Sequence, residues 1–175
     1  GICIDEIDMN ISYPPPVDID AGPDKIICGG DSVTIGGSPT VQNGTPPYYY
    51  DWSPGYLLND SALANPVAFP ATDQQFVIQV TDSSGCDYYD TVLVETSPPM
   101  NLSFNNTDVS CYGLSNGEST VNVSGGISPY NYTWSNSLGN SQSVTGLTAN
   151  QTYTVSITDS LGCFVSDTTS VGQPA

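Results

Sequence analysis

The side chains that could do chemistry in this 175-residue chain are five cysteines and eighteen carboxylates. Histidine and arginine are absent, and Lys25 is the only basic side chain. Without histidine the chain cannot form Ser-His-Asp or Cys-His catalytic sites or histidine-ligated zinc sites. The cysteines therefore point to disulfides, and the carboxylates to calcium binding or acid–base chemistry.

The formal net charge of −17 excludes further classes of function. A nucleic-acid-binding protein needs lysine and arginine to neutralise phosphates, and an anionic membrane surface would repel this chain. No run of 18 apolar residues is present, so the sequence predicts no transmembrane helix. These features favour a structural or interaction role outside the cell.

The two halves of the sequence repeat each other. Matching segments are GTPPYYYDWS (44–53) with GISPYNYTWS (126–135), and VTDSSGC (80–86) with ITDSLGC (157–163). Cys28 and Cys111 form a third matched pair, in the same order along the chain. We therefore predict two homologous domains, 17–97 and 98–175, with a linker at Pro98 and Pro99.

The segments inside each repeat are short and favour β-structure. Residues 76–80 and 153–157, for example, alternate apolar and polar side chains, and Gly, Pro, Asn and Asp clusters separate such segments. This pattern predicts an all-β fold of two tandem immunoglobulin-like β-sandwiches. We place Trp52 and Trp134 in the cores; the alternative is an exposed aromatic platform for sugars.

Four cysteines occupy matched positions in the two repeats. Cys28 and Cys86 lie near the start and in the last hairpin of the first repeat, and Cys111 and Cys163 lie at the same places in the second. In an extracellular chain these positions predict two disulfides, Cys28–Cys86 and Cys111–Cys163. Free buried cysteines are the alternative, and a metal site is less favoured because no CxxC pair occurs.

The N-terminal residues 1–16 match the last strand of a repeat. A shift of 83 residues places Cys3 on Cys86, which leaves Cys3 unpaired or available for an intermolecular bond. Ile7, Met9 and Ile11 alternate with polar residues, as in a strand with one apolar edge. Either this strand belongs to a truncated preceding domain, or it is a donor strand that docks on another protomer.

Two parts of the chain resemble known secreted domains. Residues 20–37, 52–54 and 80–94 resemble the PKD-like, immunoglobulin-like domains of secreted Bacteroidota proteins, and residues 109–163 resemble the SprB-type repeat of gliding-motility adhesins. The resemblance implies tandem modules at the bacterial cell surface, exported by a type IX system. It also implies O-glycosylation at Asp-Ser/Thr-apolar sequences, which makes Ser32, Ser61, Thr91 and Ser160 candidates. Each could equally be an ordinary residue at the start of a strand.

Two groups of aspartates could bind calcium through oxygen ligands. They are Asp18, Asp20 and Asp24, and Asp82, Asp87 and Asp90. Neither group matches an EF-hand loop, and solvated turn residues are the simpler interpretation. We predict no enzyme activity, no metal and no cofactor.

The sequence thus predicts a structural subunit of an extracellular bacterial filament or adhesin stalk, whose partners are copies of itself or neighbouring domains. The alternative is a carbohydrate-binding or adhesion module of a larger secreted protein. Four tyrosines would form its platform for glycans: Tyr48, Tyr49, Tyr88 and Tyr89.

Overall fold

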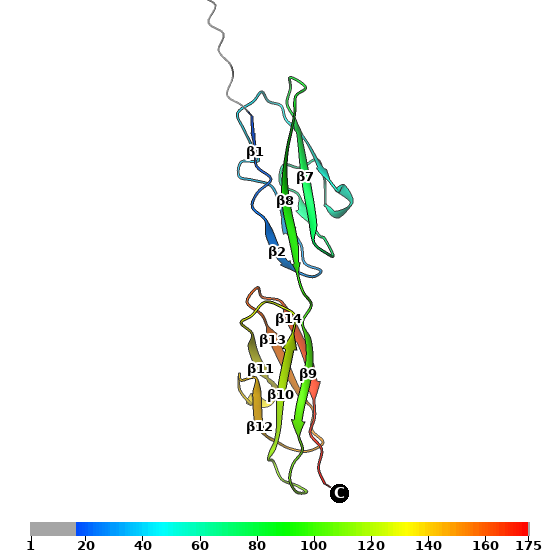
Figure 1. Cartoon of the computed structure of the whole chain (residues 1–175), viewed down its shortest axis with the longest axis vertical. Coiled ribbons are helices and arrows are strands. Elements are labelled where there is room, and N and C mark those ends of the chain that lie inside the picture. Colours follow the sequence, from blue (N-terminus) through cyan, green and yellow to red (C-terminus); the bar gives the residue numbers. More distant parts are fainter. Residues whose placement is uncertain (1–16, 175) are drawn as a thin grey trace, which may run out of the picture. The chain divides into compact units, whose positions relative to one another are not determined.

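Fourteen β-strands and two short 3-10 helices make up the regular structure of residues 17–174, which this computed structural model describes (Figure 1). The all-β prediction is confirmed. The first repeat contains β1 (Asp18–Ile19), β2 (Lys25–Cys28), β3 (Val33–Thr34), β4 (Val41–Gln42), β5 (Tyr49–Ser53), η1 (Gly55–Leu57), β6 (Val67–Ala68), β7 (Gln74–Thr81) and β8 (Asp87–Ser97). The second contains β9 (Asn101–Thr107), β10 (Gly117–Ser124), β11 (Asn131–Trp134), η2 (Ser135–Ser137), β12 (Ser143–Leu147), β13 (Tyr153–Thr158) and β14 (Phe164–Thr169).

The chain divides into two compact units that do not follow the repeats residue by residue. The described part of unit 1 comprises residues 17–24, Val33–Phe69 and Gln75–Leu93. Unit 2 comprises Lys25–Ser32, Pro70–Gln74 and residues 94–174. The domain limits 17–97 and 98–175 stay a prediction from the repeats.

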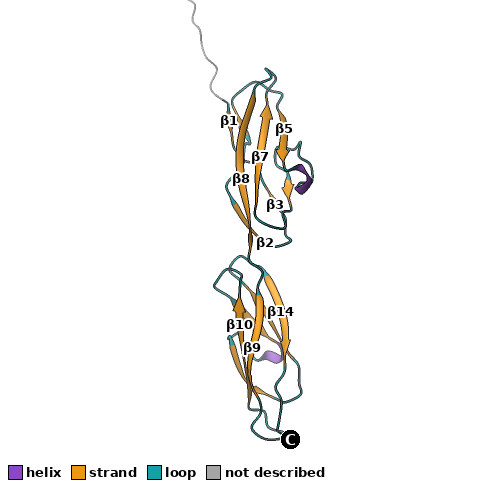
Figure 2. Ribbon diagram, turned by 45° about the vertical axis from the view of Figure 1, so that its right-hand side comes forward, coloured by secondary structure: helices purple, strands orange, loops and turns teal. Residues whose placement is uncertain are grey.

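Unit 2 contains a sandwich of two three-stranded antiparallel sheets, in the orders β12-β10-β9 and β11-β13-β14 (Figure 2). In β13, Tyr153, Val155 and Ile157 are buried and alternate with partly exposed side chains, as the sequence pattern predicts. Asn106 in β9 donates from Nδ2 to Oγ1 of Thr169 in β14 at 2.7 Å, so a polar bond also joins the two sheets.

The first repeat is built around the four-stranded sheet β2-β8-β7-β5. Within unit 1, β5 pairs antiparallel with β7, from Tyr49 opposite Thr81 to Ser53 opposite Val77. Strand β2 runs parallel to the end of β8, and Cys28 is the register partner of Ser97. Two small sheets, β1-β4 and β3-β6, complete this repeat.

Both tryptophans lie in cores, as predicted. Trp52 is 1% exposed and Trp134 is 4% exposed. Each indole Nε1 donates to a main-chain carbonyl, Trp52 to Leu63 at 3.0 Å and Trp134 to Ser141 at 2.9 Å. The same donor therefore finds the same kind of acceptor in both repeats, which supports their common origin.

The predicted N-terminal strand, with Cys3, Ile7, Met9 and Ile11, lies outside the described residues. In the part of the chain that the structure describes, no helix is both long and apolar enough to span a bilayer.

Candidate functional site

The structure contains one disulfide among its described residues, and it differs from both predicted pairs. Cys28 is bonded to Cys163, with their Cα atoms 5.5 Å apart. Cys86 and Cys111 have no disulfide partner among residues 17–174, and both are exposed. The predictions Cys28–Cys86 and Cys111–Cys163 are therefore wrong. The observed bond joins a cysteine of the first sequence repeat to one of the second, and both lie in unit 2.

Strand geometry explains why Cys28 cannot reach Cys86. Cys28 ends β2 opposite Ser97, the last residue of β8, whereas Cys86 directly precedes the first residue of β8. At about 3.3 Å per residue, this eleven-residue strand holds the two cysteines roughly 35 Å apart. A disulfide needs Cα atoms within about 7 Å.

The same argument separates Cys111 from Cys163. Cys163 directly precedes β14, whereas the N–H of Val109 donates to the carbonyl of Gly172, beyond the far end of that strand. The six residues of β14 alone span roughly 20 Å. In each repeat, therefore, the two matched cysteines lie at opposite ends of the last strand.

Cys163 is held in a tight turn between β13 and β14. Oδ1 of Asp159 accepts hydrogen bonds from the N–H groups of Leu161 and Cys163, both at 2.9 Å, and Oδ2 accepts from the N–H of Ile127 at 2.9 Å. Gly162 has φ +96°, a conformation that side chains with a Cβ rarely adopt. Within the sequence Asp-Ser-Leu-Gly-Cys, the carboxylate of the aspartate thus holds the main chain of the cysteine in place.

Asp159 is 3% exposed, yet it stays ionised. Burial by itself would raise the pKa of this carboxyl, but the N–H groups of Ile127, Cys163 and Leu161 hold the pKa below its ordinary value. The turn therefore contains a buried negative charge that main-chain donors stabilise.

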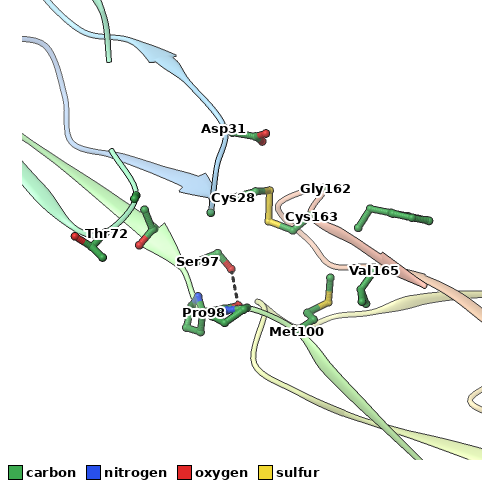
Figure 3. Close-up of a pocket in the computed structure, with 14 residues that line it drawn as sticks. Cys28, Asp31, Thr72, Ser97, Pro98, Met100, Gly162, Cys163 and Val165 are labelled. Carbon is green, nitrogen blue, oxygen red and sulfur yellow. Dashed lines mark hydrogen bonds between the residues drawn. A yellow bond between two sulfur atoms is a disulfide. The ribbon is translucent and has the colours of Figure 1, made fainter. Parts of the chain in front are cut away.

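A cavity of about 750 Å³ lies beside the disulfide in unit 2 (Figure 3). The close-up places Cys28, Cys163 and Met100 around it, and Ser97 Oγ bonds to the Pro98 carbonyl at its edge. Asp31 is the only carboxylate in its lining, which otherwise consists of small, hydroxyl and apolar side chains. This lining offers no pair of acid and base groups for catalysis.

Five of the six aspartates that were candidates for calcium binding accept hydrogen bonds from within the chain. Asp24 Oδ1 accepts from the N–H of Leu93, and Asp90 Oδ2 from the N–H of Ala21, both at 2.8 Å. Asp20, Asp82 and Asp87 accept from Gly22 N–H, Cys86 N–H and Thr81 Oγ1. Within residues 17–174, no group of three or more Asp, Glu, His or Cys is placed to hold a metal ion.

The candidate glycosylation residues differ in their surroundings. Ser32 and Thr91 are exposed, and Ser61 is half-buried. Ser160 is exposed, but its Oγ donates to the carbonyl of Ile127 at 2.8 Å. Ser32 and Thr91 are thus the more accessible hydroxyls, and their modification stays a prediction.

The four tyrosines of the alternative glycan platform are not equally exposed. Tyr49 is 65% and Tyr89 is 60% exposed, whereas Tyr48 and Tyr88 are half-buried. The hydroxyl of Tyr48 donates to the carbonyl of Asn43, so its ring is tied to a loop. Only two rings of this set stand free for stacking on a ligand.

Comparison with known proteins gives a family match within unit 2 and similar folds. Residues 103–139 match the SprB repeat family. No curated protein sequence matches the chain.

Solved structures give the fold alone. The N-terminal eight Ig domains of Down Syndrome Cell Adhesion Molecule align with a TM-score of 0.56 at 12% identity, over 89% of this chain and 27% of that one. A three-Ig structure of titin domains aligns with a TM-score of 0.51 at 14% identity, over 93% of this chain and 66% of that one. This chain thus spans less than two thirds of either relative. These structures show an immunoglobulin-like fold, and residues 103–139, within the second repeat, match the SprB repeat family.

Proposed function

We propose that this chain is a non-catalytic building block of an extracellular bacterial filament or adhesin stalk. The SprB repeat and the immunoglobulin-like fold indicate an adhesion or surface protein module. The observation that carries the finer proposal is the Cys28–Cys163 bond, because it joins two consecutive repeats covalently. A stalk needs such continuity between modules, whereas a binding module that acts alone does not.

The composition supports a role in bulk structure rather than in chemistry. A charge of −17 with one basic residue keeps copies soluble, and disulfides are stable outside the cell. The partners of the chain in this proposal are copies of itself or neighbouring domains of the same fibre. The donor-strand version of assembly depends on residues 4–13 and is tested by deleting residues 1–13.

Immunogold labelling of intact producing cells tests the stalk. Antibodies raised against this chain should decorate extracellular filaments along their length. Label confined to the cytoplasm would contradict the proposal. A filament labelled only at its tip would favour an adhesive module over a stalk.

The exposed rings of Tyr49 and Tyr89 favour glycan binding as the second candidate. A glycan array decides between the two functions. Binding that disappears in Tyr49→Ala or Tyr89→Ala, and persists in the control Tyr56→Ala, would support the binding module. Tyr56 is a suitable control because it is 80% exposed and lies in η1.

A further inference from the structure

We infer that Cys86 and Cys111 are the two halves of a head-to-tail disulfide between copies of this chain. Neither thiol has a partner among the described residues, although each is the repeat equivalent of a bonded cysteine. Cys86 corresponds to Cys163, and Cys111 corresponds to Cys28. The inference deepens the proposed function and rests on it in one respect: the copies must meet outside the cell, where thiols are oxidised.

The turn that holds Cys86 is built like the turn that holds Cys163. Oδ1 of Asp82 accepts from the N–H groups of Ser84 at 2.9 Å and Cys86 at 3.1 Å, as Asp159 does in the second repeat. The N–H of Asp82 donates to the carbonyl of Cys86 at 3.1 Å, and Gly85 has φ +80°. The bonded Cys163 and the free Cys86 thus lie in turns with matching hydrogen bonds to an aspartate four residues earlier.

The turn that holds Cys111 is likewise built like the turn that holds Cys28. The carbonyl of Cys28 accepts from the N–H of Asp31 at 3.0 Å, and the carbonyl of Cys111 accepts from the N–H of Leu114 at 3.2 Å. The third residue of each turn is a glycine with positive φ, +91° in the first repeat and +77° in the second. Each free thiol therefore lies in a turn like the one that holds a cysteine of the existing disulfide.

Apolar side chains flank the free thiol of the second repeat. Tyr112 is 81% exposed and Leu114 is 44% exposed. Exposed apolar side chains that lie close together are typical of surfaces that bind another protein. At the existing bond, Phe164 follows Cys163 and lines the adjacent cavity. The surface around Cys111 thus suits contact with the Cys86 turn of a second copy.

The bond forms by thiol–disulfide exchange with a small-molecule disulfide. The thiolate of one copy attacks this donor, which forms a mixed disulfide and releases one small thiol. The thiolate of the second copy then attacks the protein sulfur of the mixed disulfide and releases the second small thiol. Two protein thiols are oxidised, one donor disulfide is reduced, and the two thiol protons pass to the released thiols.

Complementation between two variants that each keep a single free thiol tests the inference. Both variants keep Cys28 and Cys163 and carry Cys3→Ser, because Cys3 lies outside the described residues. Cys86→Ser retains the thiol of Cys111, and Cys111→Ser retains the thiol of Cys86. Each is incubated alone, and then the two are mixed, in a glutathione redox buffer at about 0.5 M salt, which screens the repulsion between acidic chains.

We expect the mixture to give at least about tenfold more heterodimer than either variant gives homodimer, which corresponds to a docking preference of about 1.4 kcal/mol. Peptide mapping should find Cys86 joined to Cys111. Equal yields of homodimer and heterodimer, or no dimer at all, would overturn the inference. Both substitutions are at exposed positions, and circular dichroism of each variant checks that it is folded.

A moved thiol provides the matched control. The variant Cys3→Ser/Cys86→Ser/Cys111→Ser/Asn140→Cys carries its one free thiol at an exposed position in another loop of unit 2. Its yield of heterodimer with the variant that keeps the Cys86 thiol should not exceed the yield of homodimer. A higher yield of heterodimer would overturn the inference. Because the readout is a covalent bond, it is independent of the immunogold result: surface labelling without crosslinking rejects the disulfide alone.

Discussion

Asp159 accepts hydrogen bonds from main-chain donors on two loops, and its side chain is almost fully buried. One carboxylate thus ties the β13–β14 turn to the segment that contains Ile127. In the first repeat Asp82 accepts the two corresponding bonds, from the N–H groups of Ser84 and Cys86. In both repeats an aspartate at this position therefore accepts a bond from the N–H of the cysteine four residues later.

Replacing Asp159 with alanine should lower the free energy of unfolding by about 3 kcal/mol, because three main-chain N–H groups lose a buried acceptor. Urea denaturation followed by tryptophan fluorescence measures this change. The control is Asp167→Ala, an exposed residue whose carboxylate bonds only to its neighbour Thr168 in the described contacts. Equal effects of the two substitutions would refute the role of Asp159.

The stability that Asp159 contributes should disappear in acid. Its pKa is lowered in the folded protein from an ordinary value of 3.8, so the contribution is complete above pH 3.8 and is lost as the pH falls through the folded pKa. The neutral variant Asp159→Asn lacks this titration. The difference in free energy of unfolding between wild type and variant should therefore shrink from pH 6 to pH 2. A constant difference over this range contradicts the assignment.

At the scale of elements, the last strand of each repeat separates its two cysteines. β8 has Cys86 before its first residue and Cys28 beside its last. β14 has Cys163 before its first residue, and Val109, two residues before Cys111, bonds to Gly172 beyond its last. The turns at the strand ends therefore determine which cysteines can meet.

Two glycines of unit 2 allow a test of how tightly its loops are packed. Gly162 and Gly125 have φ of +96° and +79°, but a Cβ on Gly162 would meet nothing within 4 Å, whereas one on Gly125 would lie 2.1 Å from the carbonyl oxygen of Pro99. Gly162→Ala should cost about 1–2 kcal/mol from backbone strain alone. Gly125→Ala should cost clearly more, as measured by urea denaturation. The reverse order would contradict the packing of this loop.

At the scale of the whole molecule, the disulfide closes a loop of 135 residues in sequence. Peptide mapping without reduction should recover Cys28 joined to Cys163, with Cys86 and Cys111 open to alkylation by iodoacetamide in the monomer. The chain-entropy argument gives about 5 kcal/mol of stabilisation for a loop of this length. Cys28→Ser should lower the free energy of unfolding by up to that amount, and unchanged stability would contradict the bond.

The sequence was sufficient to predict the β-fold and the buried tryptophans. Trp52 and Trp134 stand in strands whose alternation is visible in the residues themselves. The cysteine pairing could not be obtained in this way, because matched positions show which cysteines are equivalent and not which lie close together. That second question depends on the length and direction of β8 and β14. A local signal was nevertheless present: Asp-Ser-x-Gly-Cys is a turn sequence, so Cys86 and Cys163 had to lie at strand ends.

The position of the Cys28–Cys163 bond along the chain has a mechanical consequence. Tension applied to the two ends of this chain passes from residue 28 to residue 163 through sulfur, and the backbone of the 134 residues between them cannot be extended while the bond is intact. These residues include every strand from β3 to β13. A pulled molecule can then extend only its short flanking segments, and in single-molecule force spectroscopy reduction should release a further contour length of roughly 480 Å, at about 3.6 Å per residue. The disulfide thus prevents tension from unravelling the backbone of most of both repeats.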